Sequence, residues 1–483
     1  MYEPILFIPS STVFIQTVSD SCDTMEKSMV IKIAAIAAVI IVVVAACAVL
    51  VSNNDDKESA EIKASLMVRG NADGNYKIDQ EDMAILDSII AGDKELKDYP
   101  LADIDGSGEV DDKDKKILQD MLDHKEGTTI YVETLDVNGN NKTVQVTYPL
   151  RNIVTYATNM EMPVVYAGGG EYIAGYFTKS YENAQASVSS KAVDLKGNQR
   201  QITTASWANF TKLDSDLKAS GSNGIGAFLV DYSGISQITA SRVSDLEAAE
   251  IPMLAYESAD SSVEGATVVT LSYLFGEKTE PIGQKYAQLS DKVVSHIDSK
   301  IKNVAKDKLK TYMCFTMYIY VCGPDSTFAS TPATAHGIPY SEVNSDFAKK
   351  YTKNSTKMDS VEALSNYSDV DCLINNRSID WQKDGDAVNK MIVSTWEHSN
   401  SGVSSAEYYK GFEDKLVYVN NLLPGPAKLA YVAAALYGDM FSYSWAESIL
   451  QECIDMGLAP LKGYTTEQIV PYFDLAKYNE AKA

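Results

Sequence analysis

Two stretches of the sequence carry oxygen-bearing side chains at the same repeated spacing. In residues 71–82 these fall at positions 1, 3, 5, 9 and 12, and position 7 would offer its backbone carbonyl: Asn71, Asp73, Asn75, Lys77, Asp79 and Asp82. Residues 103–114 repeat the pattern at an offset of 103 − 71 = 32 positions: Asp103, Asp105, Ser107, Glu109, Asp111 and Asp114. A twelve-residue loop with oxygen ligands at these positions wraps one hard cation. The sequence therefore predicts two Ca²⁺ sites.

A short amphipathic helix is expected after each loop. Its apolar face would consist of Met83, Leu86 and Ile90 in the first copy and of Ile117, Leu118 and Met121 in the second. No helical pattern precedes either loop. The apolar residue at loop position 8, Ile78 or Val110, would let the two loops pair back to back. The alternative interpretation is two acidic turns before helices, with no cation.

Duplicated loop–helix units with aspartate at position 12 resemble the dockerin family, and residues 66–124 cover its whole length. The resemblance implies calcium at both sites and, in many members, docking onto a cohesin domain. Members that bind cohesin usually carry hydroxyl pairs at loop positions 10 and 11. This chain has Gln80-Glu81 and Asp112-Lys113 there, which leaves a cohesin partner doubtful.

The overall composition is that of a globular protein with an acidic surface. The chain has 483 residues, of which 45% are apolar, enough for two or three domains with cores. Its 42 basic and 66 acidic residues give a net charge of −24, which repels phosphate backbones. Nucleic acid is therefore excluded as an expected partner.

An apolar segment near the N-terminus predicts a membrane anchor. Residues 33–51 are uncharged and form a helix of about the length that crosses a bilayer core. Lysines precede this segment and acidic residues follow it, so the positive-inside rule places the body outside the cell: Lys27, Lys32, Asp55, Asp56 and Glu58. We expect an anchor segment over 1–52 and a linker over 53–65.

Two alternatives for this segment stay open. Val44-Ala-Ala-Cys47 resembles a lipoprotein cleavage box, in which case Cys47 would carry lipid and the helix would be removed. Translation could also start at Met25 or Met29. Either anchor would tether an external protein to the cell membrane.

The cysteines show no metal-binding or redox spacing. Four of the six follow the anchor, without a CxxC motif: Cys314, Cys322, Cys372 and Cys453. Cys314 and Cys322 lie eight residues apart in one expected strand, too far apart to bond if that strand is extended. We expect buried apolar thiols.

Beyond residue 128 the pattern alternates between strands and helices, which predicts an α/β fold. Ile130–Leu135 and Lys142–Val146 form a predicted hairpin across Asn138-Gly139. Further strands are expected at 153–157, 226–230, 253–255, 312–321, 370–374 and 416–419.

One long helix is expected over 279–306, where apolar residues recur at steps of three or four. The predicted architecture is two α/β lobes, 128–278 and 307–483, joined by this long rigid helix. A small all-α calcium module and an N-terminal transmembrane helix would precede them. The alternative is a single domain with one long surface helix.

This order of elements resembles the helical-backbone class of ABC solute-binding proteins, which includes cobalamin-, haem- and ferric-siderophore-binding members. The resemblance spans about 145–475 and lies in segments 148–154, 175–177, 203–210, 246–254, 279–306, 360–364, 370–374 and 426–441. Residues 175–177 match a turn in that family. The resemblance implies a ligand held between two lobes, with an ABC permease and its ATPase as partners.

The resemblance also suggests which residues meet the ligand. Trp207, Tyr176 and Phe177 match positions of the first lobe that face the ligand, and Tyr318, Tyr320 and Trp381 are candidates in the second. His336 is a candidate contact for a metal or a propionate, and Arg377 could hold an anionic group bidentately. The alternatives are aromatic core residues, a surface or core histidine and a local salt bridge.

Permease docking in this class uses one exposed acidic residue on each lobe. Glu362 matches the position in the second lobe, and Asp216 stands where the first lobe usually has glutamate.

A rival interpretation is a dockerin-bearing cell-surface enzyme or scaffold that acts on polysaccharide. The sequence contains no GxSxG, HExxH or phosphate-binding glycine loop. We therefore expect a binding protein and not an enzyme.

Overall fold

The computed structural model describes residues 64–156, 158–177, 203–205, 207, 209–231, 235, 238–256, 260–261, 263–316, 319–323, 326–351, 356–358, 361–381, 384–400 and 403–483. The predicted anchor over 33–51, Cys47, most of the predicted linker and Tyr318 lie outside these residues, as do the side chains of Tyr176, Phe177 and Glu362. Within the described part of the chain, no helix has both the length and the apolar character needed to cross a membrane.

The acidic repeats form a small module of two helices. An extended segment, 64–70, leads into the first loop and helix α2 (Gln80–Ile90); η1 (Leu96–Asp98), the second loop and α3 (Asp112–Leu122) follow. Asp79 and Asp111 cap the two helices by accepting backbone hydrogen bonds. The buried face of α2 contains Ile85 and Leu86, whereas Ile90 is 45% exposed, so the predicted face was wrong at that position. Leu118 and Met121 of α3 are buried as expected.

The predicted hairpin is confirmed. Strands β1 (Thr129–Leu135) and β2 (Asn141–Thr147) pair antiparallel. Thr134 exchanges hydrogen bonds with the backbone of Ala255, so the hairpin lies against the neighbouring sheet.

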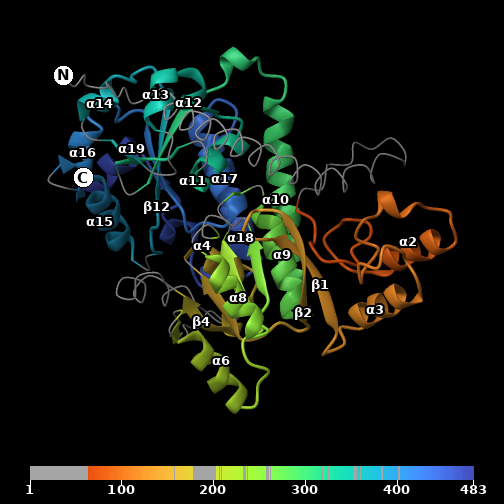
Figure 1. Cartoon of the computed structure of the whole chain (residues 1–483). Helices are drawn as coiled ribbons and strands as arrows, with labels where there is room; N and C mark the ends of the chain where they lie inside the picture. The colour runs from red at the N-terminus through yellow and green to blue at the C-terminus, as the bar shows by residue number, and fades with distance from the viewer. Residues whose placement is uncertain are drawn as a thin grey trace, which may run out of the picture.

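The first lobe contains a five-stranded parallel sheet. Its strands are β3 (Ile153–Tyr156), β4 (Ile173–Phe177), β5 (Thr203–Ala205), β6 (Ala227–Asp231) and β7 (Met253–Tyr256), in the order β5-β4-β3-β6-β7. Between these strands in the sequence the chain forms helices α4 (Thr158–Tyr166), α6 (Phe210–Ala219) and α8 (Ala240–Ala248) (Figure 1). Gly175, Tyr176 and Phe177 belong to β4 and not to a turn, because they pair with β3 and β5.

Two packed helices connect the lobes. Every residue of α9 (Glu264–Phe275) is buried, and α10 (Glu280–Ile301) packs along it (Figure 1). Helix α10 ends five residues before the predicted end at 306, and η3 (Lys306–Lys308) follows. Gly283 allows the close approach, because a Cβ there would lie 2.9 Å from the Cα of Val269.

The second lobe contains a seven-stranded mixed sheet. Its strands are β8 (Thr311–Thr316), β9 (Tyr320–Val321), β10 (Ile338–Pro339), β11 (Thr356–Lys357), β12 (Cys372–Arg377), β15 (Leu416–Asn420) and β16 (Tyr472–Phe473). The central strands β8, β12 and β15 are parallel. The single strand expected at 312–321 was wrong, since β8 and β9 are antiparallel partners.

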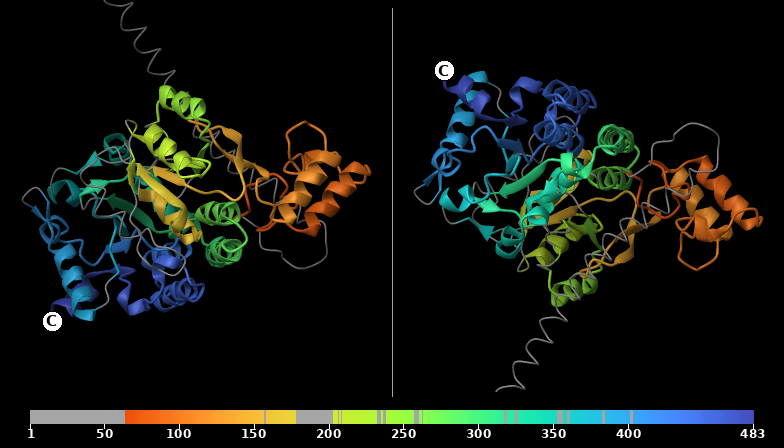
Figure 2. Two further views of the ribbon diagram at one scale, coloured as in Figure 1. Left: turned by 90° about the horizontal axis from the view of Figure 1, so that it is seen from below. Right: turned by 90° about the horizontal axis from the view of Figure 1, so that it is seen from above.

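Helices flank this second sheet. They are α11 (Thr327–Thr334), α12 (Tyr340–Val343), α13 (Ser345–Lys350), α14 (Val361–Ser365), α15 (Gly385–Trp396), α16 (Ser405–Tyr408), α17 (Gly425–Leu436), α18 (Tyr443–Asp455) and α19 (Leu475–Lys482). One cluster of buried apolar side chains runs from the module through the hairpin, α9 and α10 to α17 and α18. The module therefore shares a core with the body, and it projects to one side of the molecule (Figure 2).

Candidate functional site

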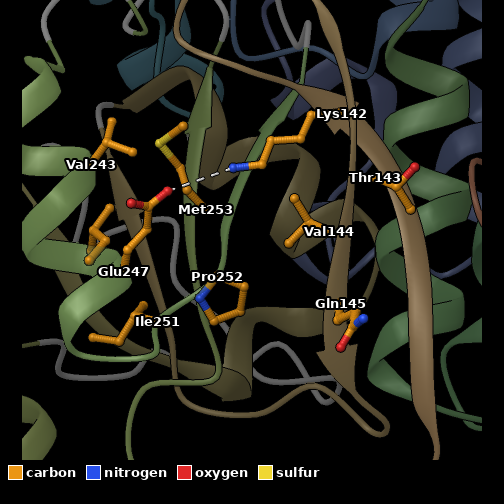
Figure 3. Close-up of a pocket in the computed structure, with 10 residues that line it drawn as sticks. Lys142, Thr143, Val144, Gln145, Val243, Glu247, Ile251, Pro252 and Met253 are labelled. Carbon is orange, nitrogen blue, oxygen red and sulfur yellow. Dashed lines mark ion pairs between the residues drawn. The ribbon is translucent and has the colours of Figure 1, made fainter.

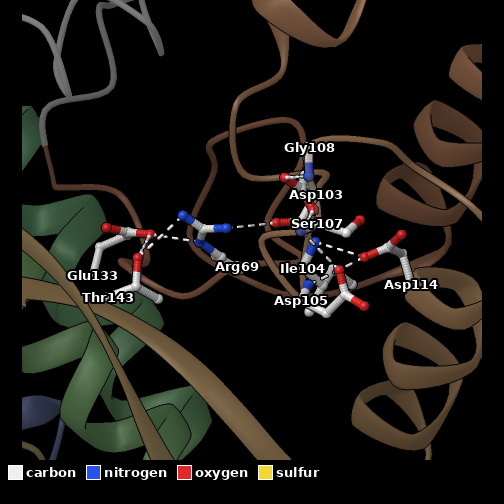
Figure 4. Close-up of polar contacts among 9 residues, drawn as sticks. All are labelled: Arg69, Asp103, Ile104, Asp105, Ser107, Gly108, Asp114, Glu133 and Thr143. Atoms are coloured by element: carbon white, nitrogen blue, oxygen red, sulfur yellow. Dashed lines mark hydrogen bonds and ion pairs between the residues drawn. The ribbon is translucent and has the colours of Figure 1, made fainter.

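The second acidic loop gathers three carboxylates. One oxygen from each of Asp103, Asp105 and Asp114 lies within 4.8 Å of the other two. Backbone N–H groups orient them: Asp103 accepts from Ser107 at 3.0 Å and from Gly108 at 2.9 Å, and Asp114 accepts from Ile104 at 2.8 Å (Figure 4). Gly106, at loop position 4, has φ 73°, a conformation that favours glycine. Asp103, Asp105 and Asp114 are three of the predicted cation ligands, and the fold brings their carboxylate oxygens close together.

The first loop contains an orphaned polar atom at its position 1. Asn71 is fully buried, and its Nδ2 donates to the carbonyls of Leu66 at 2.8 Å and Asn75 at 3.0 Å. Its Oδ1 has no hydrogen-bond partner among the described residues. A buried amide oxygen without a donor is costly unless something positive binds it. This oxygen is therefore the atom of the first loop that most needs a positive partner.

The electrostatics of the first loop fit the same interpretation. Burial and the neighbouring charge of Asp73 raise the pKa of Asp82 to about 7, and burial also raises the pKa of Asp73. A divalent cation among these oxygens would offset both effects. Asn71, Asp73, Asn75, the Lys77 carbonyl, Asp79 and Asp82 would hold it in the first loop. Asp103, Asp105, Ser107, the Glu109 carbonyl, Asp111 and Asp114 would do so in the second.

Arg69 ties the second loop to the hairpin. Its guanidinium donates to the carboxylate of Glu133 at 2.8 Å, to the carbonyl of Asp103 at 2.9 Å and to the hydroxyl of Thr143 at 3.1 Å (Figure 4). Its backbone N–H donates to Tyr131 at 2.8 Å, next to the antiparallel bridge between Val68 and Val132. The segment before the first loop therefore lies beside β1 like a third strand.

The carboxyl ends of the central strands lead into segments that connect the lobes. In the first lobe β3 leads into α4, where the phenol of Tyr166 donates to the carbonyl of Leu422, just past the end of β15. Helix α4 also contacts η4 (Ala459–Leu461). Ligands of parallel α/β sheets bind at this edge, so it is the candidate ligand site.

A buried polar cluster lies where the lobes meet α9 and α10. Tyr286 of α10 donates to the carboxyl of Glu264 at 3.0 Å and accepts from the backbone N–H of Gly425 at 2.8 Å. Tyr166 stacks on Tyr286 with ring centroids 5.9 Å apart. Burial raises the pKa of Glu264 to about 7, although the nearby Lys428 opposes that shift.

Trp207 lies just past β5, at the carboxyl edge of the first sheet. Its ring is partly buried: it stacks on Phe228 at 5.5 Å and meets Phe210 edge-on at 5.6 Å, and the guanidinium of Arg242 lies 5.1 Å above it. Part of this ring therefore packs on the lobe itself. Tyr176 and Phe177 end β4 at the same edge.

The candidates in the second lobe lie at different places. Arg377 is the last residue of β12, at the carboxyl edge, and Tyr320 lies in β9 opposite Thr316, the last residue of β8. Trp381 is buried, and its indole N–H donates to the carbonyl of Pro460 at 3.0 Å. His336 lies two residues before β10, whose Ile338 is opposite the first residue of β8, so it is near the amino edge of the sheet. Its ring forms a hydrogen bond with Asp298 of α10 at 2.7 Å. The fold thus separates His336 from the other candidates.

The two proposed docking residues lie on surface helices. Asp216 is exposed on α6 and pairs with Lys212 at 2.5 Å. Glu362 belongs to α14, which precedes β12 in the second lobe.

A pocket of about 320 Å³ lies between β2, α8 and the start of β7. Its walls include Val144, Val243, Ile251 and Met253, and Lys142 and Glu247 pair across its rim at 4.0 Å (Figure 3). It contains none of the predicted ligand residues and adjoins the amino end of β7. It is therefore separate from the candidate ligand site.

The sequence did not indicate the roles of Arg69, Glu264 and Asp291. These charged residues form hydrogen bonds between the acidic module, the hairpin and helices α9 and α10. Ala64 and Tyr76 both donate to Asp291 of α10, at 3.1 Å and 2.6 Å. A charged residue in an amphipathic helix normally indicates a solvent-facing position, so the pattern held no signal for this role.

No family model matches the chain, and no curated protein matches it. Among solved structures, the TroA-like periplasmic binding protein FepB from Veillonella parvula superposes with a TM-score of 0.51 and 12% identity, covering 71% of this chain and 99% of that chain. The molybdate periplasmic binding protein MolA of Haemophilus influenzae superposes with a TM-score of 0.45 and 11% identity, covering 68% of this chain and 97% of that chain. The chain therefore has the mixed α/β fold of TroA-like periplasmic binding proteins.

Proposed function

We propose that this chain is the extracytoplasmic solute-binding component of an ABC importer and that its ligand is an iron chelate, haem or a corrinoid. The observation that supports this proposal most is the arrangement of two sheets around α9 and α10. With this arrangement the chain superposes on almost the whole length of a periplasmic binding protein. A ligand held at the carboxyl edges would contact both lobes at once.

The chemistry of the edge residues suits such a ligand. Trp207 is a large aromatic residue and Arg377 a planar cation, and residues of these types suit a ligand with flat rings and with carboxylates such as propionates. The extensive packing of α9 against α10 and α17 favours a small closing motion. This proposal assigns the chain binding and no catalysis.

We further propose that the acidic module binds two Ca²⁺ ions and that residues 33–51 hold the body outside the cell membrane. The module would then stand between the anchor and the ligand-binding body. The resemblance of the module to dockerins stays an expectation. Within this chain the module forms hydrogen bonds with the hairpin and with α10.

The proposed ligand class can be tested by titrating the full chain with haem, cobalamin and ferric siderophores. Tryptophan fluorescence and melting temperature are recorded in each titration. We expect one of these classes to bind one to one and to raise the melting temperature, because a ligand that binds only the folded state stabilises it. Sugars and peptides are the controls. Binding of a sugar alone, or release of sugar from polysaccharide, would instead support the enzyme or scaffold alternative.

A further inference from the structure

Two thiols face each other across the hairpin of β8 and β9. The strands pair antiparallel with Phe315 opposite Val321, which places Cys314 opposite Cys322 one step further along. The backbone N–H of Cys322 donates to the carbonyl of Cys314 at 2.8 Å, which continues the ladder. The condition under which these cysteines would be too far apart, one extended strand, is not met, because the chain reverses between them. The expectation of buried thiols is confirmed for both.

The geometry of this pair suits a covalent bridge. Directly opposite residues in a hydrogen-bonded antiparallel pair have Cα atoms about 5.5 Å apart and side chains on one face. Disulfides span Cα separations of about 4.4–6.8 Å. Cys372, by contrast, lies opposite Tyr312, two residues from the partner of Cys314, at a diagonal distance of about 7–8 Å.

Both thiols are covered in the folded protein. Cys314 is 2% exposed and Cys322 is 6% exposed. The sulfur of Cys314 lies 3.1 Å from the carbonyl of Phe328 in α11 and accepts from the Asn376 amide at 2.9 Å. An oxidant therefore reaches the pair most easily while the hairpin forms, before α11 packs over it.

We propose that Cys314 and Cys322 form a cross-strand disulfide when the chain folds in contact with a disulfide oxidant. The thiolate of one cysteine attacks one sulfur of the oxidant RSSR and expels RS⁻, which takes up a proton. The thiolate of the other cysteine then attacks the protein sulfur of the mixed disulfide and expels the second RS⁻. Two protein thiols are oxidised, and RSSR is reduced to two RSH that carry the two thiol protons.

The environments of the two sulfurs differ in the folded protein. The hydrogen bond from Cys314 lowers the pKa of the Cys322 thiol, whereas burial raises the pKa of Cys314. While the hairpin forms, before that burial is complete, either thiolate can attack the oxidant first. The bridge would hold β9 beside the carboxyl end of β8, the edge to which we assign the ligand.

The test is a disulfide map of the full chain, refolded either with oxidised and reduced glutathione or with reductant alone. Free thiols are alkylated in denaturant, and chymotrypsin then cleaves between the two cysteines, after Phe315, Tyr318 and Tyr320. After oxidative refolding we expect two peptides, one with each cysteine, that stay joined until reduced. Alkylation of both cysteines, or linkage of either to Cys372 or Cys453, would overturn the proposal. The test is independent of ligand and cellular location.

Variants give a second measurement. Reduction should lower the melting temperature of the oxidised chain and leave that of Cys322→Ser unchanged, because only the former has a bridge to lose. Cys453→Ser, which removes a buried thiol elsewhere, should respond to reduction like the unmodified chain. Equal responses of all three chains would contradict the bridge even if one variant is less stable.

Discussion

The phenol of Tyr76, at position 6 of the first acidic loop, donates a 2.6 Å hydrogen bond to the carboxylate of Asp291 on helix α10. The same carboxylate accepts the backbone N–H of Ala64 at 3.1 Å and is 5% exposed. Burial and the charge of Asp291 raise the pKa of Tyr76, so its phenol remains a donor. The loop predicted to bind calcium is thus bonded to the helix that joins the lobes.

Tyr76→Phe should destabilise the whole chain. The substitution keeps the ring but leaves a buried carboxylate with one donor fewer, which costs about 1–3 kcal/mol. Chemical denaturation of both proteins measures the difference in free energy of unfolding. Tyr99→Phe, in the same module, is the control and should cost less. A double-mutant cycle with Asp291→Asn should give a clear coupling energy; a value near zero would show that the bond is unimportant.

Calorimetry on the full chain should give two bound Ca²⁺ ions. Asp73→Ala and Asp105→Ala should each remove one, and the pair together should remove both, since each deletes a central oxygen ligand. Calcium at about 100 times the dissociation constant of a site should add about 2.7 kcal/mol to the stability for each occupied site. Glu81 and Asp112 are exposed and lie outside the ligand positions. Glu81→Gln and Asp112→Ala should therefore change neither the number of bound Ca²⁺ ions nor the stability that calcium adds. Two ions bound by the double variant would contradict the assignment.

Stability should depend on the ionisation of Glu264. Its folded pKa of about 7 lies above the ordinary 4.5, so its contribution is fully present below about pH 4.5 and is lost as pH rises through about 7. The loss is on the order of 3 kcal/mol. Glu264→Gln imitates the neutral acid and should remove this part of the pH dependence between pH 5 and 8. The exposed Glu467→Gln should keep it, and identical profiles for all three chains would exclude the effect.

Glu362→Ala should lower uptake while ligand affinity stays unchanged, because a charge that docks a partner governs encounter with that partner more than ligand binding. Asp216→Ala should act in the same direction on the first lobe. Uptake in cells and ligand titration of the purified chain provide the two readouts, with Glu467→Ala as the control. A parallel loss of affinity would assign Glu362 a structural or ligand role instead.

Trp207→Ala should weaken ligand binding several-fold, since a lost stacking ring costs on the order of 0.5–1.5 kcal/mol. Because this ring also packs on Phe210 and Phe228, the variant should lose stability as well. Trp207→Phe keeps most of that packing and separates the two effects. Should both variants bind as the unmodified chain does, Trp207 serves only the lobe's core.

Local patterns were sufficient for much of the fold. The β1–β2 hairpin, strands β3, β6, β7, β12 and β15 and helix α10 appeared where periodicity and turn residues indicated them. The two helices that follow the acidic loops were also predictable, because each is indicated by residues of one short segment. Short strands such as β5 and β10 were missed, since two or three residues show no periodicity.

The sequence by itself thus determined the repeats, the alternation of strands and helices and the acidic character of the surface. The tertiary structure alone decided that Cys314 faces Cys322, that His336 lies near the amino edge of its sheet and that Asp291 receives Tyr76. The physical reason is that such contacts join residues far apart along the chain or across a reversal. Burial and pairing there depend on how whole elements pack, and no local spacing records that packing.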